Sequence, residues 1–165
     1  MPKYRGTRPK GLPKLPIAWR PWSLADRIGA VKRLGDYTLA EQQAAVAISM
    51  NEQPNRVLNG NSVGFMCWAA KYPYGWTSKV LESVQITGYT ECPEGQSDRI
   101  GFFLAFAKPE DSLLVLIRIV HSRDLTSAAN YADRWVGASD PKTRLSAMQG
   151  FESARKNVIA HWREL

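Results

Sequence analysis

The sequence is poor in the residues that bind metals or cross-link small folds. Its two cysteines, Cys67 and Cys92, lie far apart, belong to no C-x-x-C motif and have no pair of histidines nearby. This pattern excludes the common structural zinc sites, so we expect two reduced thiols and no bound metal. No apolar run approaches the roughly eighteen residues of a membrane-spanning helix, and prolines follow the cationic start. We therefore expect no membrane association and no secretory signal, in a protein that is cytoplasmic or held within a particle.

Several motifs of common enzyme classes are also missing. The sequence has no G-x-x-x-x-G-K-[ST] phosphate loop, no H-E-x-x-H zinc motif and no G-x-G-x-x-G after an expected strand. No group of carboxylates is spaced for magnesium. We therefore expect no cofactor, and the sequence favours a protein that is not an enzyme.

The first 22 residues contain no carboxylate, although they contain six cations. These cations are Lys3, Arg5, Arg8, Lys10, Lys14 and Arg20. The chain has 22 basic and 15 acidic residues, so 16 basic and 15 acidic residues remain over residues 23–165. Five prolines in the same stretch fix φ and remove backbone donors. The sequence predicts an extended, basic, proline-rich arm over residues 1–22 and a single compact domain over residues 23–165.

A cationic arm of this kind gains affinity for phosphates by releasing counterions, so nucleic acid, DNA or RNA, is the first expected partner. Leu12, Leu15, Ile17, Trp19 and Trp22 lie among the cations, which predicts that the second half of the arm docks on a surface. A solubilising tail is the alternative interpretation. Another partner is a protein subunit, including a second copy in an oligomer, because the expected loops carry acidic side chains: Glu91, Glu94, Asp98, Glu110 and Asp111.

Two helices are expected directly after the arm. Ser23 and Asp26 have capping-box spacing before a helix over residues 24–34 that ends at Gly35, and Thr38 and Glu41 repeat this spacing before an alanine-rich helix. We place three cations on the outer face of the first helix, where they extend the phosphate-binding track or are solvated: Arg27, Lys32 and Arg33. The next segment is too apolar for the recognition helix of a helix-turn-helix motif.

An aromatic loop is expected over residues 71–79, in the sequence KYPYGWTSK. Tyr72, Tyr74 and Trp76 lie beside Pro73 and Gly75, with a lysine at each end. Aromatic rings beside cations suit stacking on unpaired bases. The same residues suit a core or a protein interface, through which the chain could act as an inhibitor or adaptor on a host protein.

The middle of the chain predicts a small sheet. SVQITGYTE alternates as an edge strand does, whereas IGFFLAFA and LLVLIRIV are the continuous apolar runs of covered strands, with KPED as a hairpin loop between them. DLTSAANYADRWVG predicts a helix capped by Asp124 or Thr126. Asp140 and Pro141 begin a long last helix with one apolar stripe: Leu145, Met148, Phe151, Val158 and Trp162. The expected fold is α+β, a three-stranded antiparallel meander flanked by N-terminal and C-terminal helices.

The strongest candidate for catalysis is the segment IRIVHSRD. Arg118, His121 and Arg123 stand at or beyond the end of an expected buried strand, where a histidine and two guanidinium groups could transfer a proton and hold a phosphate. The order of apolar hairpin and RIVHSRDL, over Arg99 to Leu125, resembles the C-terminal part of RelE/ParE-type toxins. That resemblance implies a small nuclease or toxin. A strand end and a helix cap are the alternative interpretation.

Charge segregation, rather than any motif, decides the expected function. We expect a structural or accessory protein of a nucleoprotein or multi-subunit assembly, of the virion or ribonucleoprotein type. The arm is expected to bind nucleic-acid phosphates or a neighbouring subunit. The nuclease and the adaptor remain as alternatives.

Overall fold

The structure is a computed structural model, and it describes residues 4–5, 11–64, 79–93 and 99–163. The fold is mixed α+β. Its helices are α1 (Leu24–Leu34), α2 (Leu39–Glu52), α3 (Pro109–Arg123), α4 (Ala128–Asn130), the π-helix η1 (Tyr131–Val136) and α5 (Pro141–Trp162). Its strands are β1 (Tyr4–Arg5), β2 (Trp19–Pro21), β3 (Arg56–Leu58), β4 (Ile86–Pro93) and β5 (Arg99–Phe106).

The first two helices begin where the capping boxes predict. The Ser23 hydroxyl accepts a hydrogen bond from the backbone N–H of Asp26 at 3.0 Å, and the Asp26 carboxylate accepts one from the backbone N–H of Ser23. Thr38 and Glu41 form the same reciprocal pair at the start of α2. Each pair satisfies two backbone donors that a helix start otherwise leaves unpaired. Both helices are confirmed, and α1 ends at its C-cap residue Gly35, which has a φ of 63°.

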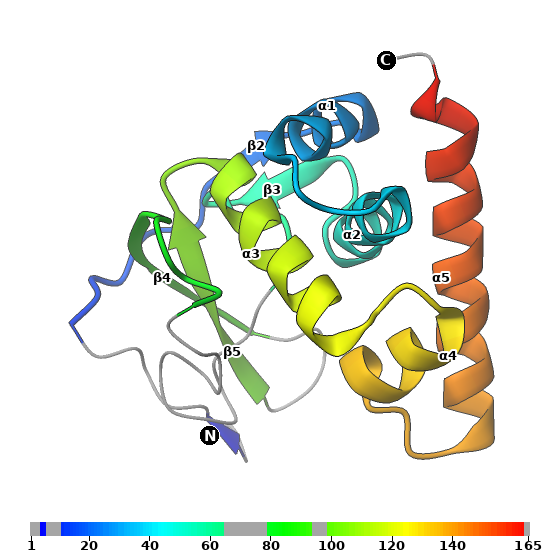
Figure 1. Cartoon of the computed structure of the whole chain (residues 1–165). Coiled ribbons are helices and arrows are strands. Elements are labelled where there is room, and N and C mark those ends of the chain that lie inside the picture. The colour runs from blue at the N-terminus through cyan, green and yellow to red at the C-terminus, as the bar shows by residue number, and fades with distance from the viewer. Residues whose placement is uncertain (1–3, 6–10, 65–78, 94–98, 164–165) are drawn as a thin grey trace.

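Helix α2 is the centre of the core. Residues 44–49 are fully buried, and the helix packs against α1, α3 and α5 (Figure 1). Three of these six residues are alanines, which allow neighbouring helices to approach closely. Phe151 and Val158 of α5 complete the core from the other side. The long last helix is confirmed with Asp140 as its cap, but Leu145 is 57% exposed and lies off the buried stripe.

The strands form two separate sheets. β4 and β5 make an antiparallel hairpin, and the two residues of β1 pair with β5 in parallel. β2 and β3 make a second, two-stranded antiparallel sheet. Of the three strands expected in the meander, β4 and β5 are present. The expected three-stranded antiparallel meander is therefore not the fold of the chain.

The error lies in the segment LLVLIRIV, which is helix α3 and not a strand. The predicted hairpin loop KPED is the start of this helix, with Lys108 as N-cap, Pro109 in the first turn and two carboxylates after it. Pro at this position and carboxylates near a helix N-terminus both favour a helix start. The apolar run is continuous because α3 is buried between the β4–β5 hairpin and the other helices (Figure 1).

The second half of the arm lies against the domain. The Leu15 N–H donates to the Tyr89 carbonyl at 2.8 Å, and the Tyr89 N–H donates to the Pro13 carbonyl at 3.0 Å. Further along, β2 pairs with β3, and the Trp22 side chain enters the core with 5% of its area exposed. Residues 12–22 are thus held by backbone pairing and by burial.

The segment after α3 differs from its predicted form. Asp124 ends α3 in the left-handed conformation, with φ of 52°, and the next helix is capped by Ser127 rather than by Asp124 or Thr126. That helix has one short α-helical turn and then continues as the π-helix η1. None of the helices in the described ranges is long and apolar enough to cross a membrane.

Candidate functional site

Lys14 and Arg20 of the arm are exposed. Lys14 lies 3.7 Å from the Glu91 carboxylate, with 60% of its side chain exposed, and Arg20 is exposed on β2. Only the Lys14 side of this ion pair is exposed, because 12% of the Glu91 side chain is exposed. The backbone of Arg5 lies in β1. Three predicted arm cations lie outside the described residues: Lys3, Arg8 and Lys10.

Arg27 is fully buried, so its predicted place on the outer face of α1 is wrong. Its guanidinium group donates to the Ser49 carbonyl at 2.8 Å, to the Ser49 hydroxyl at 2.7 Å and to the carbonyls of Trp22 and Gln53. Burial lowers the pKa of Arg27 to about 10, and the nearby Asp26 carboxylate opposes this shift. Arg27 therefore stays charged at neutral pH and joins the end of the arm to the end of α2.

The other two cations of α1 are exposed. Lys32 donates to the Trp162 carbonyl at 2.9 Å, and its ammonium group lies 5.0 Å from the centroid of the Trp162 ring. Lys32 thus connects α1 to the last turn of α5. Arg33, the next residue of α1, is exposed. The aromatic residues Tyr72, Tyr74 and Trp76 lie outside the described residues, and the adaptor hypothesis stays a prediction.

The three residues predicted for catalysis do not converge. The His121 Nδ1 atom lies 2.5 Å from a carboxylate oxygen of Glu41, whereas Arg118 donates to the carbonyls of Val80 and Glu82. Arg123 contacts the Arg134 carbonyl on a third side of α3, and Arg134 donates to the Arg123 carbonyl at 2.8 Å. Each side chain joins α3 to a different neighbour. The resemblance to toxins was based on an expected hairpin of apolar strands before His121, and the second of these strands is helix α3.

A serine-centred motif is also present, although it is not a nucleophile site. The residues GNSVG over 60–64 match the G-x-S-x-G pattern of serine hydrolases, in which the serine is exposed on a sharp turn. Here Ser62 is fully buried, and its hydroxyl lies 2.6 Å from the Ser112 hydroxyl. Asn61 holds the same loop by accepting hydrogen bonds from the backbone of Val63 and Gly64. The motif is part of the core.

An exposed stack between β2 and β3 is a feature that the sequence did not predict. The Arg56 guanidinium carbon lies 4.1 Å from the centroid of the Trp19 ring, and 46% of Trp19 is exposed. This distance is well within the range of a cation–π contact. The sequence identifies Trp19 only as an apolar residue of the arm, because nothing in it shows that β3 lies beside this residue.

A carboxyl group with a raised pKa was not predicted either. Glu52 is an exposed residue at the end of α2, and one of its carboxylate oxygens accepts a hydrogen bond from the Trp135 indole at 3.0 Å. The other oxygen lies so close to Gly64 that a Cβ there would be 3.1 Å from it. Burial of the carboxyl group raises the pKa of Glu52, and the Trp135 hydrogen bond opposes this upward shift only in part. A carboxyl group in such a setting is a candidate proton donor or acceptor.

The π-helix η1 supplies both aromatic neighbours of Glu52. Tyr131 and Trp135 stand four residues apart on η1. Tyr131 is buried and stacks on Phe151 with ring centroids 5.0 Å apart. Burial raises the pKa of its hydroxyl, and the charge of Glu52 adds to this effect. Because π-helical turns occur often at functional sites, η1 gives a second, geometric reason to consider Glu52.

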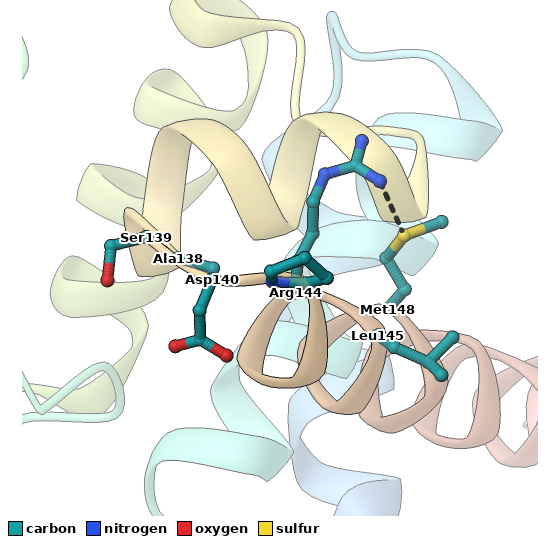
Figure 2. A pocket seen from close by; sticks show the side chains of 7 residues that line it. Ala138, Ser139, Asp140, Arg144, Leu145 and Met148 are labelled. Atoms are coloured by element: carbon teal, nitrogen blue, oxygen red, sulfur yellow. Dashed lines mark hydrogen bonds between the residues drawn. The ribbon is translucent and has the colours of Figure 1, made fainter.

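A surface pocket lies at the connection between η1 and α5. Its volume is about 540 Å³, and Figure 2 shows the Arg144 side chain among the lining residues, with a hydrogen bond to the sulfur of Met148. Arg144 also forms an ion pair with Asp133 at 2.8 Å, and the Asp140 carboxylate accepts from Thr143. The two charged groups that line this pocket, Asp140 and Arg144, thus already have partners of their own, Thr143 and Asp133.

The described residues include no cluster of histidine, cysteine or carboxylate side chains that could hold a metal ion. Comparisons of the chain with protein-family models, with curated proteins and with solved structures find no match. The function therefore has to be argued from the residues themselves.

Proposed function

We propose that this protein is a non-enzymatic accessory component of a nucleoprotein or multi-subunit assembly, and that its arm binds nucleic-acid phosphates. The observation that carries the proposal is the segregation of charge, six cations and no carboxylate in residues 1–22 against a nearly neutral remainder. Polyanion binding is driven by such a local excess of cations. A neighbouring subunit with an acidic surface is the alternative occupant.

The way in which the arm is attached supports this proposal. Residues 13–15 are hydrogen-bonded to Tyr89, and residues 19–21 are paired with β3. The backbone at Lys14 and Arg20 is therefore already ordered before a partner binds, which lowers the entropic cost of binding.

The test replaces cations in the full-length chain instead of truncating it, because removal of residues 1–22 would also remove β2 and the buried Trp22. A variant with four substitutions, Lys3→Ser, Arg5→Ser, Arg8→Ser and Lys10→Ser, is titrated with duplex DNA and with RNA over a range of salt concentrations. The slope of log affinity against log salt should fall by about 0.9 for each duplex phosphate that the variant no longer neutralises. The matched control replaces four cations outside the arm: Lys108, Lys142, Lys156 and Arg163. Equal slopes for the two variants would reject the arm as the phosphate-binding element.

The Glu52 cluster favours a second candidate function, acid–base catalysis. A carboxyl group that is held protonated more readily than usual can donate a proton to a leaving oxygen, as in the hydrolysis of ester, phosphodiester or glycosidic bonds. The specific observation is that the Trp135 indole donates to one oxygen of this carboxylate, while a Cβ at Gly64 would lie 3.1 Å from the other.

Glu52→Gln tests this candidate, with Glu41→Gln as the control on the same helix. If Glu52 is a general acid, the unaltered protein hydrolyses at least one bond in a panel of nucleic-acid, ester and polysaccharide substrates. Glu52→Gln should then lower the rate by about 100-fold or more, whereas Glu41→Gln should leave it unchanged. Full activity in Glu52→Gln, or an inactive native protein across the panel, would reject the candidate.

A further inference from the structure

The exposed ring of Trp19 and the guanidinium group of Arg56 form one continuous surface. In the β2–β3 sheet, Trp19 lies opposite Leu58 and Pro21 lies opposite Arg56, so Trp19 and Arg56 are diagonal neighbours on the same face. The guanidinium carbon is 4.1 Å from the ring centroid and covers one side of the indole. With 46% of Trp19 exposed, the ring still presents a large area to solvent.

This surface is built on a rigid backbone. The Asn59 N–H donates to the Ala18 carbonyl, and the Asn59 side chain donates to the Pro16 carbonyl at 3.0 Å. On the other side of Trp19, the Trp22 N–H donates to the Asn55 carbonyl at 2.9 Å. The strand that carries Trp19 is thus fixed at both ends before any partner arrives, which lowers the entropic cost of binding.

The surroundings favour an anionic partner. Arg56 is exposed, and within residues 11–64, 79–93 and 99–163 it forms no ion pair. Arg20 follows Trp19 on β2 and lies on the opposite face of this sheet, and the rest of the basic arm precedes Trp19. A flat aromatic ring beside exposed cations combines the two groups that nucleic-acid strands contact, one for the base and one for the phosphate.

We propose that the Trp19–Arg56 surface is a stacking platform for an unpaired base of single-stranded nucleic acid. This inference rests on the proposed nucleic-acid function and names the class of strand. In a duplex the base faces are already stacked on one another, so a protein ring gains access only to a base that is free of pairing. The base stacks on the open area of the Trp19 indole, while Arg56 attracts the adjacent phosphate.

The test compares binding of a labelled thymidine homopolymer with binding of a duplex of equal length to the full chain. Trp19→Ala should weaken single-strand binding by about 5- to 150-fold, the range for loss of one stacked base. It should leave duplex binding by the arm unchanged. Trp19→Phe should restore most of the affinity, because phenylalanine keeps an aromatic face. Ile17→Ala is the matched control, since Ile17 is 54% exposed on the same segment but has no ring.

The outcomes separate this inference from the proposed function. If Trp19→Ala binds the single strand as tightly as the native protein does, and both bind it in a salt-dependent way, the platform is rejected and the arm proposal stands. If Ile17→Ala loses as much affinity as Trp19→Ala, the surface is a general apolar contact and the stacking role is rejected. If the native protein binds neither nucleic acid, both proposals fail. Because Trp19 and Ile17 are exposed, each variant should keep the native fold. Circular dichroism of each variant checks this.

Discussion

A single buried arginine organises the junction between the arm and the helical core. Arg27 donates to carbonyl groups at the end of the arm, at Trp22, and at the end of α2, at Ser49 and Gln53. The last carbonyls of a helix have no partner within the helix, and the planar guanidinium group can satisfy several of them at once. Arg27 therefore stabilises the fold instead of binding a ligand.

Arg27→Ala should lower the free energy of unfolding by about 3 kcal/mol or more, because several buried carbonyls lose their donor. Arg27→Lys should also destabilise the fold, since a single ammonium group cannot donate to the Trp22 carbonyl and to the carbonyls of Ser49 and Gln53 as the planar guanidinium group does. Urea denaturation measures both effects. Arg33→Ala, on the exposed side of the same helix, is the control and should change stability by less than about 0.5 kcal/mol. A lysine variant as stable as the native chain would contradict this assignment.

The position of Arg27 could have been recognised from the sequence. Leu24, Arg27 and Val31 are spaced by three and four residues, so they share one face of α1. Positive charge alone suggests an outer face, and the spacing is the better indicator. By contrast, the Trp19–Arg56 stack and the neighbours of Glu52 join segments far apart in the chain, which local sequence patterns do not reveal.

At the scale of elements, the helices with local start signals were predicted well. Caps at Ser23, Thr38 and Asp140 depend on a few adjacent residues, and all three are present in the structure. Helix α3 was missed because a fully buried helix and a fully buried strand both give a continuous apolar run. The signals at its start, Pro109 followed by Glu110 and Asp111, distinguish the two. The π-helical form of η1 has no such local signal.

The docking of the arm on β4 depends on a glycine. A Cβ at Gly88 would lie 2.5 Å from the Pro13 carbonyl oxygen and 2.8 Å from the Leu15 side chain. Gly88→Ala should therefore push residues 13–15 away from β4 and leave the helical core folded. Trypsin should then cut after Lys14 about tenfold faster, which corresponds to about 1.4 kcal/mol of docking free energy.

Gly150→Ala is the matched control for this experiment. Gly150 lies within α5, and a Cβ there would meet no atom within 4 Å. The control should gain about 0.5–1 kcal/mol of stability from helix propensity and should not change the cutting after Lys14. An unchanged cutting rate in Gly88→Ala would show that the arm is not held at this crossing.

For the molecule as a whole, the shifted carboxyl groups predict how stability depends on pH. Burial opposes the ionisation of Glu41, but hydrogen bonds from Thr38 and His121 outweigh it and lower its pKa. The Arg144 hydrogen bond lowers the pKa of Asp133, and the Thr143 hydrogen bond lowers that of Asp140. A lowered pKa stabilises the fold above the unfolded value, and this contribution is lost as pH falls through the folded value. Glu52 acts in the opposite direction, because its raised pKa removes stability as pH rises through the folded value.

Among the described residues, the pKa is lowered for three carboxyl groups and raised for one, which predicts that the denaturation midpoint falls below about pH 4, near the ordinary values of Asp and Glu. Urea titrations between pH 7 and pH 2.5 measure this change. Glu41→Gln should make the acid dependence shallower, whereas Asp36→Asn, which removes an exposed carboxyl group just before α2, should not. A midpoint that rises between pH 4 and pH 3 would contradict the prediction.

The place of α5 in the core has a consequence for synthesis of the chain on the ribosome. Phe151 and Val158 are fully buried, α5 packs against α1 and α2 from the first third of the chain, and Lys32 of α1 donates to the Trp162 carbonyl. The helices α1 and α2 therefore leave the exit tunnel with an apolar surface that α5 covers only later. During that interval the nascent protein is a substrate for chaperones that bind exposed apolar segments.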